Sequence, residues 1–209
     1  ALHPNAREPL ARLAARIGGV LATTLKARGL FRGDDFDLGV FGTLSTPVAT
    51  DAIMQSDCII SFGAGLNAFT TSHGAFLKGK RIVEINAEPR DLGKNCVPDA
   101  GLVGDPGQVA ETIIEWLDIA EIPASGFRTE ELRHRIASHS LEPVLFPEVG
   151  KDGKYVDIRK ALLRLNAMLP SDRVVVADAG RFLPEVWRTF DVEDPRDFVD
   201  TVAFASIGL

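Results

Sequence analysis

The sequence predicts an α/β fold, with a Rossmann-like parallel-sheet domain followed by the partial start of a second α/β domain. Short and almost wholly apolar segments, which suit strands buried in a parallel sheet, alternate with segments whose apolar residues recur at helical spacing. The alternation stops in a stretch broken by Pro123, Pro143 and Pro147, and it resumes after Gly153. We therefore expect a first domain over residues 1–120, an inter-domain linker over 121–153 and the N-terminal part of a second domain over 154–209.

The first domain is expected to hold five short strands with mostly apolar centres, over residues 20–24, 37–41, 57–62, 81–86 and 101–103. Helical spacing predicts helices over residues 7–17, 47–55 and 109–117. Thr46 is a suitable N-cap for the second of these helices, and Pro47 suits its first position. Because the chain opens directly on a helix, the first strand of this domain is expected to be missing.

The linker is expected to contain one polar helix, over residues 129–138. In the second domain the pattern predicts a helix over 156–169, a strand over 173–177, a turn over 178–180 and a helix over 181–190. Val202 and Phe204 indicate a last short buried strand, and Ser206-Ile207-Gly208 indicates the turn into a further helix. That helix does not follow in the sequence, so we expect the chain to be a piece of a larger protein.

The composition argues against several classes of protein. A net charge of -6 without a basic stripe argues against binding of nucleic acid. No apolar run approaches the ~20 residues that span a bilayer, so no membrane association is expected. No secretory signal opens the chain, and we expect a cytoplasmic location. Cys58 and Cys96 stand outside any metal-ligand spacing, and the apolar strand around Cys58 predicts a reduced thiol in the core.

Three stretches of the chain together form a recognisable pattern. The first runs from Ala52 to Pro89 and joins two apolar strands through the turn Gly63-Ala64-Gly65-Leu66-Asn67. The second is Gly101–Asp105, and the third combines Val174–Gly180 with Phe204–Leu209. In this order they resemble the thiamine-diphosphate-dependent enzymes of the acetolactate synthase and 2-oxo acid decarboxylase superfamily. The resemblance covers nearly the whole chain and implies most of the family's central domain and the start of its pyrophosphate-binding domain.

The resemblance implies that Gly180, Arg181 and Phe182 bind the cofactor. They would lie at the cofactor diphosphate, where a helix start offers N–H groups and an arginine adds a charge partner for phosphate. Taken without the resemblance, the same turn is typical of an ordinary helix N-terminus with a solvated arginine.

The resemblance also implies cofactor contacts at the end of the chain. Ala205 and Ser206 would contact the cofactor mainly through backbone groups. Ile207 would be the apolar side chain that holds the two cofactor rings in a bent conformation, which is catalysis by proximity. The alternative for Ile207 is an ordinary core isoleucine at a strand end.

The other family sites are not expected in this chain. The arginines that mark the FAD-binding and ADP-binding types are missing around Gly63–Asn67, so FAD is not expected and the first domain should serve as a scaffold. Thiamine diphosphate and Mg²⁺ are expected in the whole enzyme, but the family's Gly-Asp-Gly magnesium motif and its catalytic glutamate are absent here. We therefore expect no catalytic residue, no metal ligand and no activity of this chain alone.

The leading hypothesis is part of a thiamine-diphosphate-dependent carboligase or decarboxylase that acts on 2-oxo acids. Because active sites in this family lie between subunits, a homo-oligomer, either a dimer or a tetramer, is expected. One alternative is a stand-alone nucleotide-binding or regulatory Rossmann-like domain. Another is a non-catalytic scaffold in which residues 154–209 serve only for association.

Overall fold

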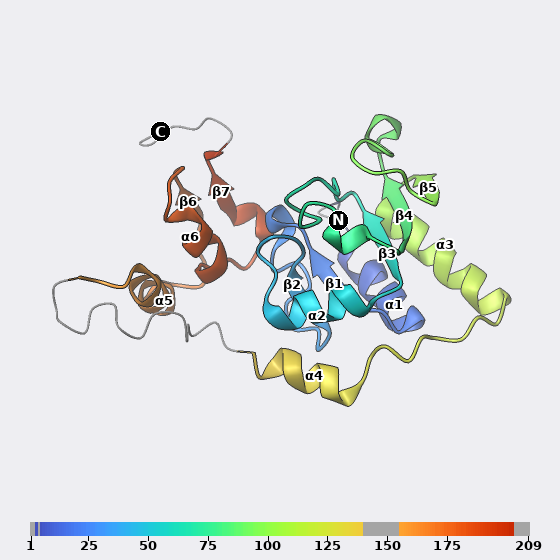
Figure 1. The fold of residues 1–209 in the computed structure, drawn as a ribbon, viewed down its shortest axis with the longest axis horizontal. Helices are drawn as coiled ribbons and strands as arrows, with labels where there is room; N and C mark the ends of the chain where they lie inside the picture. The colour runs from blue at the N-terminus through green and yellow to red at the C-terminus, as the bar shows by residue number, and fades with distance from the viewer. Residues whose placement is uncertain (1–2, 4, 140–154, 203–209) are drawn as a thin grey trace. The chain divides into compact units, whose positions relative to one another are not determined.

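The computed structural model describes residue 3 and residues 5–139 and 155–202. The chain divides into two compact units, which we call unit 1 (residues 1–138) and unit 2 (residues 139–209). Each unit contains helices and parallel strands, which confirms the α/β fold class. Figure 1 shows the order of these elements along the chain.

Unit 1 contains two separately hydrogen-bonded parallel sheets. The strands β1 (Leu21–Thr23) and β2 (Asp37–Val40) form one of them. The other has the order β3-β4-β5 and consists of β3 (Cys58–Phe62), β4 (Arg81–Asn86) and β5 (Ala100–Val103). Because all of these pairings are parallel, the carboxyl ends of β3, β4 and β5 meet at one edge.

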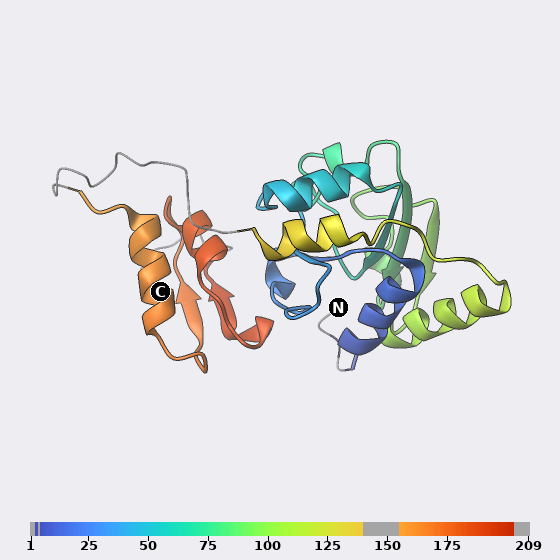
Figure 2. The same cartoon turned by 90° about the horizontal axis from the view of Figure 1, so that it is seen from below.

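The helices of unit 1 lie on both sides of its strands. They are α1 (Arg7–Ile17), α2 (Pro47–Gln55), α3 (Pro106–Ile119) and α4 (Glu130–Ala137). Figure 2 shows α1 beside α3, with α2 on the opposite side of the strands. Short 3-10 helices at Leu25–Ala27, Ala75–Leu77 and Pro89–Asp91 lie in the connections between paired strands.

Local sequence explains where these helices begin. The Thr46 hydroxyl accepts a hydrogen bond from the Ala49 amide (3.1 Å), so the expected N-cap of α2 is confirmed. Asp105 caps α3 by accepting from the Gly107 and Gln108 amides. This cap starts α3 at Pro106, three residues before the position that apolar spacing alone had indicated.

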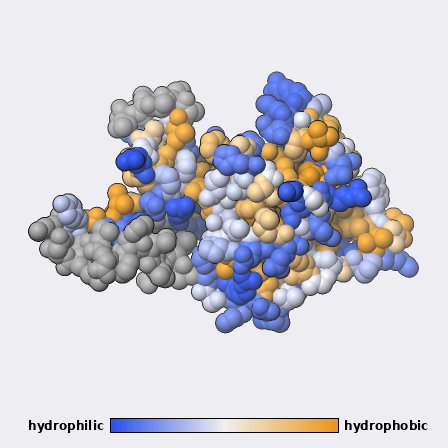
Figure 3. All heavy atoms as spheres, in the orientation of Figure 1, coloured by the Kyte–Doolittle hydropathy of each residue, from blue (hydrophilic) through white to orange (hydrophobic). Residues whose placement is uncertain are grey.

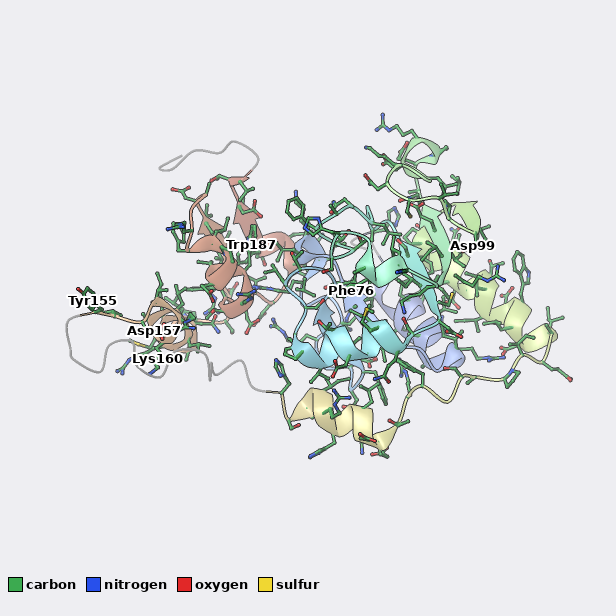
Figure 4. All side chains as sticks on the ribbon, viewed as in Figure 1. Phe76, Asp99, Tyr155, Asp157, Lys160 and Trp187 are labelled. Atoms are coloured by element: carbon green, nitrogen blue, oxygen red, sulfur yellow. The ribbon has the colours of Figure 1, made fainter. Side chains whose placement is uncertain are left out.

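The core of unit 1 consists of two apolar clusters. One joins α1 to α3 through buried residues that include Leu10, Leu13 and Ala110. The other joins α2 to β2 and includes Ile53, Leu38 and Phe76. The Phe76 ring, labelled in Figure 4, meets the Phe41 ring edge to face. The two ring centres are 5.2 Å apart.

Residues 121–138, which we expected to form the first part of a linker, belong to unit 1 and contact its earlier residues at several points. The Ser125 amide donates to the Ile17 carbonyl (2.9 Å), and its hydroxyl donates to the Gly18 carbonyl (3.0 Å). The Arg128 guanidinium donates to the Gly19 carbonyl (2.6 Å). Leu132 of α4 is buried in the cluster around α2. The carbonyl group of Ile17, the last of α1, and those of Gly18 and Gly19 are therefore satisfied by residues more than 100 positions later.

The described part of unit 2, residues 155–202, contains the helices α5 (Ile158–Met168) and α6 (Leu183–Thr189) and the parallel strands β6 (Val175–Ala177) and β7 (Phe198–Asp200). A 3-10 helix at Pro195–Asp197 precedes β7. Val175 and Ala177 pack on side chains of both helices. The other face of the sheet exposes Val176 (65%) and its register partner Val199 (45%).

Two expectations from the sequence are wrong. Within residues 155–202 the last strand covers Phe198–Asp200 and does not include Val202, because Phe198 contacts the core of unit 2 while Val202 is exposed. Phe204 lies outside the described residues. Cys58 does lie in a strand, but it is exposed because it begins β3, an edge strand of its sheet. Among the residues that the structure describes, no helix is long and apolar enough to span a membrane.

Candidate functional site

The carboxyl ends of β6 and β7 meet at one edge of unit 2, where a ligand of a parallel sheet usually binds. The strand pairing ends at Ala177 and Asp200. Beyond it, the Thr201 amide donates to the Ala177 carbonyl (3.1 Å), and the Thr201 hydroxyl donates to Asp178 Oδ1 (3.2 Å). The structure thus places the turn over residues 178–182, which follows β6, next to the end of β7.

Gly180 and Phe182 shape this turn together. The Leu183 amide donates to the Gly180 carbonyl (3.1 Å), and the Glu185 amide donates to the Phe182 carbonyl (3.0 Å), which begins α6. A Cβ atom added at Gly180 would lie 2.5 Å from Cε1 of the Phe182 ring. The ring therefore gives a packing reason for the glycine, apart from any ligand.

Arg181 extends from the same turn and is exposed. Some other arginines of unit 2 are held by acids, among them Arg159 by Asp157 at 2.7 Å and Arg196 by Asp194 at 2.5 Å. The hydrogen bond from Arg196 lowers the pKa of Asp194 to about 2. Within residues 155–202, no acidic side chain pairs with Arg181. Its guanidinium is therefore available to an anion at this edge.

The other implied cofactor residues, Ala205, Ser206 and Ile207, lie outside the described residues. They follow Val202 along the chain, and Val202 follows the edge formed by β6 and β7. Among the implied cofactor residues, the structure thus describes Gly180, Arg181 and Phe182. It places these three together in the turn at the edge formed by β6 and β7.

The corresponding edge of unit 1 carries the glycine turn after β3. Gly63 has a φ of 65°, and its amide donates to the Ile85 carbonyl (2.8 Å), which fixes the turn beside β4. The Asn95 side chain donates to the Gly65 carbonyl at 2.5 Å. The chain's own segment after β4 thus contacts the turn that nucleotide-binding folds present to a ligand.

Glu84 is a buried carboxylate at this edge that the sequence did not reveal. It is 3% exposed, and its two oxygens accept from the Asn86 side chain (3.0 Å) and the Gly93 amide (2.8 Å). Both bonds are local to β4 and the segment after it, so Glu84 fixes that segment against the strand. The one sequence signal for this role was the position of Glu84 in an apolar strand. An acid buried in such a strand requires hydrogen-bond partners.

Acidic residues of the described chain do not form a metal site. The structure contains no group of three or more His, Cys, Asp or Glu in residue 3 or in residues 5–139 and 155–202 that could hold a metal ion. Asp105, in the Gly101–Asp105 stretch, instead caps α3 and pairs with His3 at 2.8 Å. His73 is exposed beside the Phe69 ring.

The contact between Asp178 and Thr201 was also missed from the sequence. The expected strand around Val202 had left Thr201 without a role, whereas β7 ends one residue before it. The sequence signal for this contact was that Asp178 and Thr201 each follow a short apolar segment that suits a strand. Val175-Val176-Ala177 precedes Asp178, and Phe198-Val199-Asp200 precedes Thr201.

Comparisons with known proteins give one family. A family model described as "thiamine pyrophosphate enzyme, central domain" matches residues 1–113. These residues contain all strands of unit 1 and most of α3.

Relatives in this comparison are acetolactate synthases. A large subunit from Pyropia yezoensis is 30% identical over 99 residues, which are 46% of this chain and 17% of the relative. A probable large subunit from Methanocaldococcus jannaschii is 24% identical over 98% of this chain and 35% of the relative. An acetolactate synthase from Mycobacterium leprae is 24% identical over 99% of this chain and 33% of its own length. The chain therefore spans about a third or less of these relatives.

Proposed function

The chain belongs to the thiamine pyrophosphate enzyme family, and from this premise we propose that it is the part of an acetolactate-synthase-like enzyme that carries one side of the cofactor site. The alignment with the Methanocaldococcus jannaschii relative carries this proposal, because it continues through unit 2 and covers 98% of the chain. Unit 1 is the central domain in this proposal, and unit 2 begins the domain that binds the cofactor diphosphate.

The edge of unit 2 suits a diphosphate in its chemistry. Arg181 offers a guanidinium that no acid in residues 155–202 neutralises, and it stands in the turn after a parallel strand. Gly180 leaves room for the Phe182 ring in the turn that carries Arg181. Ala205, Ser206 and Ile207 complete the site in this proposal, with Ile207 as the apolar support of the cofactor rings.

In the whole protein, thiamine diphosphate, when bound, would supply the nucleophilic carbon for chemistry on a 2-oxo acid. The residues of this chain bind and orient the cofactor. Mg²⁺ neutralises the diphosphate in this proposal, and its ligands come from outside this sequence, which lacks a Gly-Asp-Gly motif. We therefore propose that these 209 residues alone catalyse no turnover.

Calorimetry with the 209-residue chain tests this proposal. Thiamine diphosphate with Mg²⁺ should bind, and Arg181→Gln should weaken the affinity about tenfold, the effect of one charge-assisted hydrogen bond. Arg164→Gln, which removes an exposed arginine of α5, is the matched control and should leave the affinity unchanged. Binding of ADP, FAD or NAD without binding of thiamine diphosphate would instead support a nucleotide-binding domain.

We further propose that the whole protein is a homo-oligomer. The apolar face of the β6–β7 sheet supports association, since parallel sheets are normally covered on both faces. A second exposed apolar area lies at the far end of α3, where Trp116 and Ile119 are exposed (Figure 3). Sedimentation equilibrium of the 209-residue chain tests association through these two surfaces, and a monomer at all concentrations up to ~100 μM would contradict it.

A further inference from the structure

A side-chain contact extends the pairing of β6 and β7 by one residue. The backbone register ends at Ala177 and Asp200, and the Thr201 amide then donates to the Ala177 carbonyl (3.1 Å). The Thr201 hydroxyl donates to Asp178 Oδ1 (3.2 Å). We call this pair of hydrogen bonds the Thr201 clasp. Figure 1 shows β6 and β7 side by side, with α6 next to them.

The clasp lies where two segments of the chain separate. Asp178 opens the turn that carries Arg181, and Thr201 is the first residue after β7. The strand pairing behind the clasp has only three residue pairs. Asp178 and Thr201 are both half-buried, so water competes less for their hydrogen bond than it would at an exposed site. One hydrogen bond at this position therefore restricts the turn relative to β7.

We propose that Asp178 and Thr201 are positioning residues, and that the Thr201 clasp sets the spacing between the Arg181 turn and the end of β7. Neither side chain touches the cofactor in this proposal; the clasp acts through Arg181. The inference rests on the proposed function for the identity of the ligand. The clasp itself is independent of any ligand and is tested without one.

The first test is a double-mutant cycle with Asp178→Ala and Thr201→Val in the 209-residue chain. Amide hydrogen exchange is measured at Leu183, Glu185 and residue 201, which donate the hydrogen bonds of the turn and the strand end. Each single variant should exchange about fivefold faster at these amides, the effect of one lost hydrogen bond. The double variant should be no faster than Asp178→Ala alone, because Asp178→Ala already removes the contact that Thr201→Val removes.

Conservative variants separate the contact from general damage to the fold. Thr201→Ser keeps the hydroxyl donor and Asp178→Asn keeps an oxygen acceptor, so both should exchange at the wild-type rate. Thr112→Val removes a hydroxyl that bonds to the Gln108 carbonyl in α3 and should leave the amides of unit 2 unchanged. Additive effects in the cycle, or unchanged exchange in Thr201→Val, would overturn the clasp.

The second test is the affinity for thiamine diphosphate with Mg²⁺, measured by calorimetry on the same variants. Thr201→Val should weaken binding about fivefold, and Thr201→Ser should restore it. Coupled exchange with unchanged affinity would overturn the positioning role while leaving the clasp in place. If the wild-type chain binds no thiamine diphosphate, the proposed function of this edge fails, and the exchange cycle still decides on the clasp.

Discussion

Gly18→Ala should destabilise unit 1 far more than an alanine at a comparable glycine. Gly18 ends α1 with a φ of 67°, a conformation that costs an alanine about 1–2 kcal/mol. A Cβ atom at Gly18 would also lie 2.3 Å from the Ser125 carbonyl oxygen. This contact forces the segment around Ser125 away from α1. The two hydrogen bonds that Ser125 makes to Ile17 and Gly18 are then lost.

The size of the effect follows from these two contributions. Each lost hydrogen bond lowers the free energy of unfolding by about 1 kcal/mol, so the total for Gly18→Ala is about 3–4 kcal/mol. Gly79 provides the matched control, because its φ is 74° and no atom lies within 4 Å of an added Cβ. Gly79→Ala should therefore cost only the backbone part, about 1–2 kcal/mol.

The measurement is urea unfolding followed by tryptophan fluorescence in a Trp187→Phe background. Trp116 on α3 is then the only tryptophan, so the signal reports on unit 1. A difference of about 2 kcal/mol between the two alanine variants is expected. If the two variants differ by less than about 0.5 kcal/mol, residues 121–138 do not hold the end of α1 as the structure indicates.

Two further predictions concern unit 1. Leu132→Ala should lower the free energy of unfolding by about 2–3 kcal/mol, because Leu132 is only 9% exposed in the cluster around α2. Ile119→Ala, at an 81% exposed position, should change it by less than about 0.5 kcal/mol in the same urea titration. Burial raises the pKa of Asp37 above its ordinary value of 3.8. The free energy of unfolding therefore falls as the pH rises from 3.8 through the raised pKa, because the buried carboxyl must then lose its proton. Asp37→Asn should therefore gain more stability relative to wild type at pH 7 than at pH 3, and equal differences at both pH values would refute this sign.

The local rules of sequence predicted most elements of this chain. Apolar spacing gave α1 its observed bounds, Arg7–Ile17, and the Thr46-Pro47 pair gave the start of α2. The glycine turn after β3 and the turn after β6 were also recognised in their places. These features depend on residues within a few positions of one another, and such contacts can be deduced from a single stretch of sequence.

The features that were missed depend on partners far along the chain. Ser125 and Arg128 were assigned to a linker because their hydrogen-bond acceptors, the carbonyl groups at the end of α1, stand more than 100 residues earlier. Cys58 was expected in the core, but burial depends on which strand lies at the edge of the sheet. The last strand was misplaced because Phe198 and Val202 are both apolar, and only the packing of Phe198 decides between them.

The sequence by itself determined the α/β class and the family resemblance. Composition, periodicity and motif order are enough for these two, since they follow from residue types and spacing alone. The role of Arg181 at the candidate site is implied by the resemblance and stays a prediction. Only the tertiary structure decided that Thr201 meets Asp178, that Glu84 is buried with the Gly93 amide, and that no acid in residues 155–202 pairs with Arg181. The physical reason is that these facts depend on distances between residues that chain folding brings together, and those distances depend on the packing of whole elements.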